Sequence, residues 1–535
     1  MTDKRIYLYD TTLRDGAQTQ GVNFGPSDKA VIARELDRLG IDYIEGGWPG
    51  ANPTDDAFFA EPPVLKHAKL SAFGMTRRSG RSAENDPGLA ATLGSGVKAA
   101  CLVGKTWDFH VRMALKIPLE ENIAMIRESV ALTAKRLDEA LFDAEHFFDG
   151  YKADPAFTLG CVRAAYEGGA RWIVLCDTNG GTLPHEIERI VGEVTKTIPG
   201  DRLGIHCHND TENAVANSLA AIRAGARQIQ GTLNGLGERC GNANLVSLIP
   251  SLMLKMGYET GIDEEGLRHL THVSRLVDER LNRSPNRHAP YVGEAAFAHK
   301  GGLHVSAVEK DPRSYEHIDP EAVGNRRHIV VSDQAGRSNL IARLRELGIE
   351  PPTDEGKLHS LLETIKQREF DGFSYDGAEA SFELLARRAL GSVPEYFRVH
   401  SFRVIDERRW SVLSGVETLS EATIKIDVGT IGKGGEHIMT VSEGNGPVNA
   451  LDAALRKALV PVFPELEGIR LTDYKVRILT PQEGTKAMTR VMIESTNGES
   501  EAWSTIGVST NVIDASFGAL HDSLTFKLWR SGRRS

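Results

Sequence analysis

The sharpest chemical signal in the sequence is a pair of histidines separated by one residue. His206 and His208 lie in the segment RLGIHCHND, residues 202–210, which begins with the apolar character of a strand. Residues i and i+2 of a strand point to the same side, so both imidazoles can reach one ion while Cys207 points away. Two histidines, one carboxylate and open positions suit a divalent metal that acts as a Lewis acid. Two solvated histidines at a strand end are the simpler alternative.

The carboxylate for such a site is Asp15, in the opening stretch YDTTLRDGAQTQ. A short apolar strand ends there, and Arg14 and Asp15 follow together, with Gly16 directly behind them. A surface salt bridge between Arg14 and Asp15 would be worth under about 1 kcal/mol and would not explain the polar residues around it. We therefore predict that this turn lies at the mouth of an active site.

A glycine-rich loop, GLGERCGNANL, follows the last strand-like segment of the first half of the chain. Such a loop allows the backbone to approach a ligand closely. Asn242 could add an amide oxygen to the metal, or it could cap the helix that begins just after it, and the sequence leaves both interpretations open. Cys240 is interpreted as a spectator thiol, because the spacing of a nucleophilic triad does not accompany it.

Eight strand-like segments, each followed by a helical pattern, must position these residues. They lie at residues 6–10, 43–47, 69–74, 98–104, 140–148, 172–178, 202–210 and 227–235. This number and spacing predict a (β/α)8 barrel. The competing architecture, a doubly wound sheet, lacks its glycine fingerprint after the first strand. The first barrel helix is predicted to begin with Ser27 as its N-cap.

The polar residues fall where a barrel places its catalytic groups, at the carboxyl ends of the strands. Besides the residues already named, four strands end in Asp10, Glu45, Glu145 and the run Asp177–Thr178. We therefore assign residues 1–260 to a catalytic barrel, 261–395 to a helical connector and 396–535 to a separate α+β domain. The fold class is α/β.

Composition limits the classes of partner. The chain has 535 residues and a net charge of −10, which argues against nucleic acid. Apolar runs are too short to span a bilayer, and the N-terminal residues carry no apolar signal segment. Five cysteines without C-x-x-C spacing predict free thiols in a reducing compartment. We expect a cytoplasmic protein with neither a membrane nor a nucleic-acid partner.

Four segments, YDTTLRDGAQ, HCHND, GLGERCGNANL and EGNGPVNALDAAL, together resemble the acyl-CoA Claisen-condensing synthases. That family includes 2-isopropylmalate, homocitrate and citramalate synthases, within a barrel superfamily that also holds hydroxymethylglutaryl-CoA lyases and pyruvate carboxyltransferase domains. The segments IEGGWPGANPTD, FDAEHFFDGYK and AHKGGLHVSAV look most like the citramalate synthase group. The resemblance implies an acyltransferase that condenses acetyl-CoA with pyruvate and water to give (R)-citramalate and CoA, for isoleucine biosynthesis.

The resemblance also implies roles for individual residues. A divalent ion (Mg, Mn or Zn, which the sequence does not distinguish) would be held by Asp15, His206, His208 and Asn242. Arg14 would bind the keto oxygen of the 2-oxo acid, and Thr178 would bind its carboxylate unless it caps the following helix. The remaining catalytic residues would be Glu145 and His304, which share the proton transfers in an order left open, and Tyr315, which the partner subunit supplies in some members.

The C-terminal domain resembles the allosteric dimer module of these synthases, which implies a homodimer or larger homo-oligomer inhibited by isoleucine. The connector is then expected to fold over the active site. One residue departs from the family pattern: Asp143 faces the same side as Glu145, where an apolar wall around pyruvate is expected. A 2-isopropylmalate synthase inhibited by leucine is therefore the first alternative. A retro-Claisen lyase and a non-enzymatic amino-acid sensor are further ones.

Overall fold

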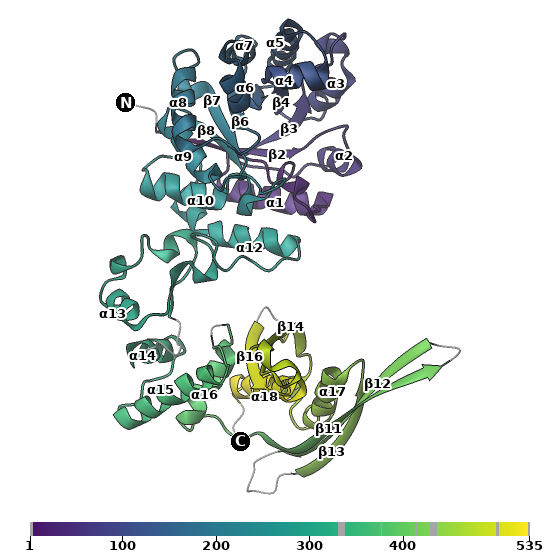
Figure 1. Ribbon diagram of the computed structural model, residues 1–535, viewed down its shortest axis with the longest axis vertical. Coiled ribbons are helices and arrows are strands. Elements are labelled where there is room, and N and C mark those ends of the chain that lie inside the picture. Colours follow the sequence, from purple (N-terminus) through teal and green to yellow (C-terminus); the bar gives the residue numbers. More distant parts are fainter. Residues whose placement is uncertain are drawn as a thin grey trace. The chain divides into compact units, whose positions relative to one another are not determined.

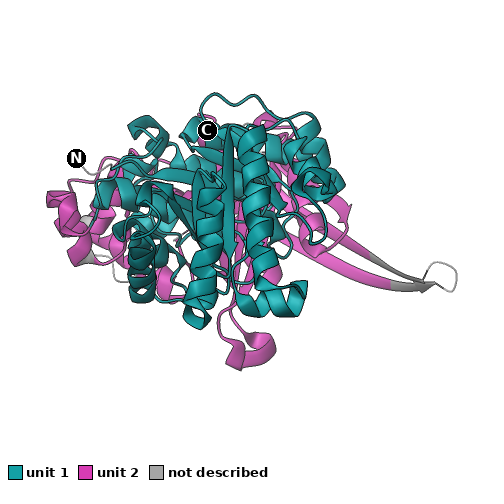
Figure 2. Cartoon of the chain, turned by 90° about the horizontal axis from the view of Figure 1, so that it is seen from above, with its two compact units in different colours: residues 1–297, 316–327 teal, residues 298–315, 328–535 magenta. Residues whose placement is uncertain are grey.

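The computed structural model describes residues 4–329, 337–375, 377–411, 415–428, 436–498 and 502–532. The chain divides into two compact units, which Figure 2 shows in two colours. Unit 1 comprises residues 1–297 and 316–327, and unit 2 comprises residues 298–315 and 328–535.

Unit 1 is built on a closed barrel of eight parallel strands in the order of the chain, visible at the centre of this unit in Figure 1. The strands are β1 Tyr7–Asp10, β2 Tyr43–Gly47, β3 Lys69–Met75, β4 Ala99–Lys105, β5 Glu139–Glu145, β6 Trp172–Asp177, β7 Leu203–Cys207 and β8 Gln228–Gly231. The barrel closes where β8 pairs with β1 in parallel, with Tyr9 opposite Gln230. The predicted (β/α)8 barrel is confirmed.

Three predicted strands, at residues 140–148, 202–210 and 227–235, run three or four residues too far, and the last of them, β8, ends at Gly231. β5 ends at Glu145, and the short helix α6 (Phe147–Ala153) begins two residues later. β7 ends at Cys207, so His208 lies one residue beyond it, held by an isolated bridge to Asn242. Apolar character continues past β5 because Phe147 and Phe148 of α6 are buried. The residues that follow β7, His208 to Asp210, are polar.

Helices surround the barrel and cover its outer face. The longer ones are α1 Pro26–Leu39, α2 Pro53–Ala60, α3 Pro87–Leu93, α5 Leu119–Arg136, α7 Pro155–Glu167, α8 Pro184–Val194, α9 Ala214–Arg223, α10 Leu245–Pro250 and α12 Leu270–Arg280. The predicted cap at Ser27 is wrong: α1 has Gly25 as its N-cap, and the Gly25 amide donates to Asp28. Pro26 starts the helix because its fixed φ suits the first helical position.

Side chains fill the barrel interior in layers. The apolar layer is formed by Tyr9, Tyr43, Ala99, Cys101, Leu141, Trp172, Val174 and Cys176. Between the strands and helices lies a second core, which includes Ile44, Phe142 and Ile173, all fully buried. A large side chain buried in this way contributes about 1.5–3 kcal/mol to folding. The barrel is therefore a packed, rigid support for the polar groups at its mouth.

Unit 2 contains helices followed by an α+β domain. The helices are α13 Gly302–Lys310, α14 Arg337–Glu346, α15 Glu355–Phe370 and α16 Glu379–Ala389. One antiparallel sheet has the strands β11 Phe397–Ser411, β12 Gly415–Val428 and β13 Glu436–Gly444, followed by α17 Pro447–Leu459. The other has β14 Arg470–Ile478, β15 Thr489–Thr496 and β16 Ala502–Ser509, followed by α18 Val512–Arg530. The predicted α+β C-terminal domain is confirmed.

Among the described residues, every helix is too short or too polar to cross a membrane.

Candidate active site

Asp15, His206 and His208 come together at the mouth of the barrel, at the carboxyl ends of β1 and β7. Asp15 Oδ2 lies 3.2 Å from His206 Nε2 and 4.0 Å from His208 Nε2. One donor atom from each residue lies within 4.8 Å of the others, and all three side chains are buried. Three nitrogen and oxygen donors converging on one point have the spacing that a divalent ion requires.

The donor atoms fit an ion in a second respect. Oδ1 of Asn242 is buried and has no hydrogen-bond partner among the described residues. Buried polar atoms are normally paired, so such atoms mark a place where a further ligand is expected. Asn242 Nδ2 donates to Asp15 Oδ2 at 3.1 Å, which places its side chain beside the cluster.

The two interpretations of Asn242 can now be compared. The helix after the loop, α10, is capped by Asn244, whose Oδ1 accepts from the Val246 amide at 3.0 Å. Asn242 therefore does not cap this helix, and its side chain faces Asp15. The loop must turn tightly to bring it there: a Cβ on Gly241 would lie 2.0 Å from the carbonyl oxygen of Gly235, so only glycine fits.

The pKa values of Asp15 and His208 are both lowered, whereas the Asp15 carboxylate outweighs burial and raises the pKa of His206. Burial would raise the pKa of Asp15, but Arg14 and His206 outweigh burial and hold it well below its usual range. Burial and the neighbouring His206 lower the pKa of His208 to about 4. At neutral pH Asp15 is therefore ionised and the imidazole of His208 is neutral, and these are the forms that bind metal.

Arg14 is held rigidly inside the barrel. Its Nε donates to Glu45 Oε2 at 2.7 Å, and its Nη1 lies 3.6 Å from Asp15 Oδ1. The guanidinium lies over the ring of Phe73, 3.9 Å from its centroid. Glu45 is itself fixed by the hydroxyl of Tyr9 at 2.9 Å. The predicted position of Arg14 beside the Asp15 cluster matches this geometry, while the part of Glu45 in anchoring it was missed.

Glu145 ends β5 and faces the barrel mouth with a basic partner that the sequence analysis missed. Lys105 stands directly opposite Glu145 in the register of β4 and β5, and its Nζ lies 2.5 Å from Glu145 Oε2. The next residue, His146, has a φ of 57°, an uncommon conformation for a residue other than glycine. Lys105 ends a strand, so the strand-end rule that selected Glu145 would also have found it.

Thr178 does not cap the helix that follows it. The N-cap of α8 is Leu183, whose amide donates to Glu186. Instead, the Thr178 hydroxyl accepts a hydrogen bond from the His146 amide at 2.8 Å, which ties the ends of β5 and β6 together. The hydroxyl proton remains available for a ligand, because a hydroxyl can accept and donate at the same time.

Asp143 does not form an open polar wall. It is buried, and its Oδ1 accepts a hydrogen bond from Gln230 Nε2 at 2.9 Å. Asp143, which departs from the family pattern, is therefore hydrogen-bonded inside the barrel to a partner that the sequence analysis did not identify.

Cys240 is exposed at the surface, consistent with a spectator thiol.

His304 and Tyr315 belong to unit 2. Their rings stack with centroids 4.1 Å apart, and both side chains are exposed. The structure thus brings these two predicted catalytic residues together. Their participation in the barrel site remains a prediction.

Comparison with known proteins extends this description to the whole chain. A family model described as HMGL-like matches residues 5–277, and one described as Homocitrate synthase post-HMGL domain-like matches residues 291–371. A third, the LeuA allosteric (dimerisation) domain, matches residues 376–528.

The (R)-citramalate synthases of Aquifex aeolicus and Geobacter sulfurreducens are each 51% identical to this chain, and the alignments cover 98% of both partners. The 2-isopropylmalate synthase of Dictyoglomus turgidum is 31% identical, with 96% of each chain covered.

The barrel carries this donor cluster and matches the HMGL-like model. The protein is therefore an acyltransferase of a family that depends on a divalent metal. The LeuA domain adds a module for oligomerisation and for binding a small-molecule effector. Within this class the chain belongs to the (R)-citramalate synthase family. The family and enzyme class expected from the resemblance are confirmed.

Proposed function

We propose that this protein condenses acetyl-CoA with pyruvate and water to give (R)-citramalate and CoA. The observation that supports this most directly is the Asp15–His206–His208 cluster with Arg14 beside it at one barrel mouth. A 2-oxo acid is a ligand whose carboxylate and keto oxygens suit such a site. The high identity to (R)-citramalate synthases over the whole chain selects pyruvate among the 2-oxo acids.

The ion would be held by Asp15, His206 and His208, with Asn242 completing the set. When bound, a divalent ion supplies Lewis acidity that polarises the keto group. Nitrogen and carboxylate donors of this kind accept Mn, Zn or Mg, so metal replacement must decide which of them supports activity.

Arg14 stabilises the negative charge that develops on the keto oxygen. Its guanidinium is pre-oriented by Glu45, so it needs no reorganisation when that charge appears. Thr178 donates its hydroxyl proton to the substrate carboxylate, with its own oxygen fixed by the His146 amide. These two contacts set the orientation of the 2-oxo acid.

Glu145 and His304 share the proton transfers. One removes a proton from the acetyl methyl group, whose carbon then joins the keto carbon of pyruvate; the other activates the water that cleaves the thioester and releases CoA. Lys105 orients the Glu145 carboxylate through their ion pair. Tyr315 stacks on His304 and so fixes the plane of its imidazole. The assignment of His304 and Tyr315 is supported by the resemblance of their segments to those of the family.

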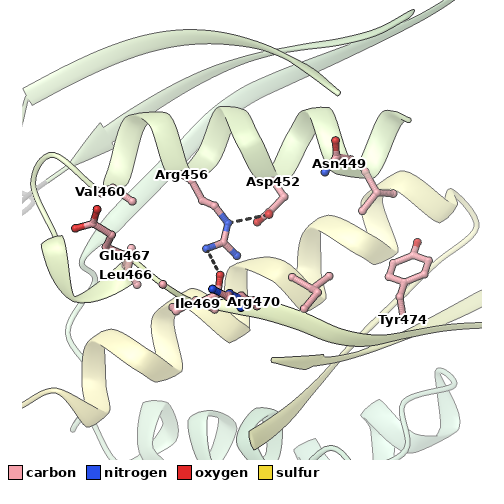
Figure 3. Close-up of a pocket in the computed structure, with 12 residues that line it drawn as sticks. Asn449, Asp452, Arg456, Val460, Leu466, Glu467, Ile469, Arg470 and Tyr474 are labelled. Carbon is pink, nitrogen blue, oxygen red and sulfur yellow. Dashed lines mark hydrogen bonds and ion pairs between the residues drawn. The ribbon is translucent and has the colours of Figure 1, made fainter. Parts of the chain in front are cut away.

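An effector site is proposed in the C-terminal domain, in a cavity of about 640 Å³ between α17 and β14 (Figure 3). Asp452 Oδ2 accepts from Arg456 Nε at 2.8 Å, and Arg456 Nη1 donates to the Ile469 carbonyl at 3.0 Å. Asp452 Oδ1 is buried without a hydrogen-bond partner among the described residues, and it suits an ammonium group.

The rest of this cavity fits a branched amino acid. Its walls include the apolar side chains of Val448, Val460, Leu466 and Leu471. The remaining N–H groups of Arg456 can take the carboxylate of an amino acid whose ammonium binds Asp452. We propose isoleucine as the effector and a homodimer as the assembly, on the basis of the LeuA domain and the citramalate synthase relatives.

Metal add-back tests the proposed reaction. The protein is stripped with a chelator, and CoA release from acetyl-CoA and pyruvate is followed as Mn, Zn or Mg is returned. We expect release only with a metal and only with both substrates, and citramalate as the product by mass spectrometry. CoA release without a 2-oxo acid, or without formation of citramalate, would contradict the proposal.

A further inference from the structure

Three buried side chains form a hydrogen-bonded chain across the barrel interior below the donor cluster. Asp143 of β5 accepts from Gln230 Nε2 of β8 at 2.9 Å. Gln230 Oε1 lies 2.8 Å from His206 Nδ1, and Gln230 and His206 are direct neighbours in the register of β7 and β8. Their exposed fractions are 4% for Asp143, 0% for Gln230 and 5% for His206.

Only one placement of the hydrogen atoms fits the donors and acceptors of these three side chains. An amide has donor hydrogens only on nitrogen, so Nε2 of Gln230 facing Asp143 leaves its oxygen facing His206. An amide oxygen can only accept, so His206 Nδ1 must carry a hydrogen and donate it. The opposite amide orientation would need a hydrogen on Asp143 and none on His206 Nδ1.

We propose that Asp143 and Gln230 are positioning residues that fix His206 with its hydrogen on Nδ1 and its lone pair on Nε2. Nε2 lies 3.2 Å from Asp15 Oδ2, so an ion that displaces this contact would receive the Nε2 lone pair and the carboxylate together. The inference rests on the proposed metal-dependent function and assigns to Asp143 a role in orienting a ligand, in place of an apolar wall.

The second histidine of the cluster lacks this support. Nδ1 of His208 has no hydrogen-bond partner among the described residues. The two imidazoles therefore differ: His206 is pre-organised for metal binding, and His208 is not. Partners of this kind raise metal affinity by about 10–100-fold when they orient a ligating histidine.

Four variants separate this role from general damage to the barrel. Gln230→Leu removes the acceptor for His206. Gln228→Leu is the matched control, because Gln228 is a buried glutamine two residues earlier on the same strand, with no hydrogen-bond partner for its side chain among the described residues. Gln230→Glu places a second carboxylate against Asp143. Adding Asp143→Asn to Gln230→Glu restores a donor–acceptor pair, because the new amide donates to the new carboxylate, which still accepts from His206.

Metal affinity, measured by equilibrium dialysis with Mn²⁺ and with Zn²⁺, is the readout beyond activity. We expect Gln230→Leu and Gln230→Glu to weaken binding by roughly 10–100-fold. Gln228→Leu should bind as the wild type does, and the double variant should recover most of the loss. The KM for acetyl-CoA should change little in all four, because none of these side chains is assigned to that substrate.

The outcomes distinguish this inference from the proposed function. Wild-type protein that binds no divalent ion would overturn the metal site itself. Wild-type protein that binds metal, together with Gln230→Leu of equal affinity, would overturn only the positioning role. If Gln230→Leu does not fold, the comparison of Gln230→Glu with the double variant decides: equal affinities contradict the inference, and recovery in the double variant supports it.

Discussion

Arg14 donates from Nε to Glu45 at 2.7 Å, and this ion pair joins the ends of β1 and β2 inside the barrel. Glu45 is fully buried, and only 12% of the Arg14 side chain is exposed. Burial raises the pKa of Glu45 and the charge of Arg14 opposes that shift, so the two groups depend on each other. The pair holds the guanidinium beside Asp15 without leaving a buried charge unpaired.

Removal of Glu45 is expected to affect both stability and catalysis. Glu45→Leu leaves the Arg14 charge without its main partner, which costs about 3–5 kcal/mol for buried pairs. Glu45→Gln keeps an oxygen for Arg14 Nε and should cost less. Urea unfolding and kcat/KM for pyruvate measure the two effects. Equal stability of Glu45→Leu and wild type would show that the pair does not anchor Arg14.

His208→Ala should lower metal occupancy and abolish CoA release while the fold survives. The variant removes one of three converging donors and leaves the barrel core intact. His185→Ala, at an exposed histidine of α8, is the matched control and should behave as wild type. Metal content by mass spectrometry and circular dichroism provide the measurements. A fully loaded and active His208→Ala protein would exclude His208 as a ligand.

Glu145→Gln and His304→Asn should each lower kcat by roughly 10²-fold or more, the scale of acid–base catalysis. Glu145→Gln keeps the size of the side chain and His304→Asn shortens it, and both remove its ability to take a proton at neutral pH. Steady-state kinetics with metal-saturated enzyme gives kcat separately from KM. Turnover near that of wild type in either variant removes that residue from the proton transfers.

Asp10 should make the protein less stable as pH rises. Burial raises its pKa from 3.8 to about 7, with the Thr12 hydrogen bonds opposing the shift. Well below pH 3.8 the folded and unfolded chains both hold the proton, so the contribution of the group is complete. Between about pH 4 and 7 the unfolded chain releases the proton first, and stability falls by up to about 1.4 kcal/mol per pH unit.

Asp10→Asn cannot titrate, so it provides the comparison for this effect. The melting temperature of Asp10→Asn minus that of wild type should increase steadily between pH 5 and 7 and stay constant above pH 7. Thermal unfolding of both proteins across this range tests the sign directly. A difference that is independent of pH would show that Asp10 is ionised throughout.

Asp452→Asn should relieve inhibition by isoleucine and leave uninhibited activity unchanged. The variant removes the carboxylate proposed to hold the effector ammonium, so the concentration for half inhibition should rise at least roughly tenfold, about 1.4 kcal/mol. Lys457→Ala, on the same helix but outside the cavity lining, is the control. Calorimetry with isoleucine and leucine on the full-length protein identifies the ligand. Unchanged inhibition in Asp452→Asn would place the effector elsewhere.

Much of the fold followed from periodicity. Most barrel strands are short apolar runs followed by polar residues, a pattern that a single sequence displays. Strand ends were less predictable, and past β5 the reason is that the buried Phe147 and Phe148 continue its apolar pattern. The N-cap of α1 was misplaced for a local reason: a serine that suits a cap follows Pro26, and the proline takes the first helical position.

The site was predictable where its residues lie on one strand or one loop. His206 and His208 could be paired by the period of two, whereas the sequence left Asn242 open between a metal ligand and a helix cap. Lys105, Gln230 and Glu45 act through partners on other strands, and those pairs appear only when the barrel closes. Asp143 was recognised as unusual, but its partner on β8 could not be inferred from spacing along the chain.

The selectivity of CoA release among 2-oxo acids tests the central claim most directly. With metal-loaded enzyme and saturating acetyl-CoA, kcat/KM is measured for pyruvate, 2-oxobutyrate, 2-oxoisovalerate and 2-oxoglutarate. We expect pyruvate to give the highest value, because a pocket shaped for its methyl group disfavours larger side chains by about 1–3 kcal/mol per added methylene, roughly 10–200-fold. A higher kcat/KM for 2-oxoisovalerate would instead make the protein a 2-isopropylmalate synthase and contradict the proposed function.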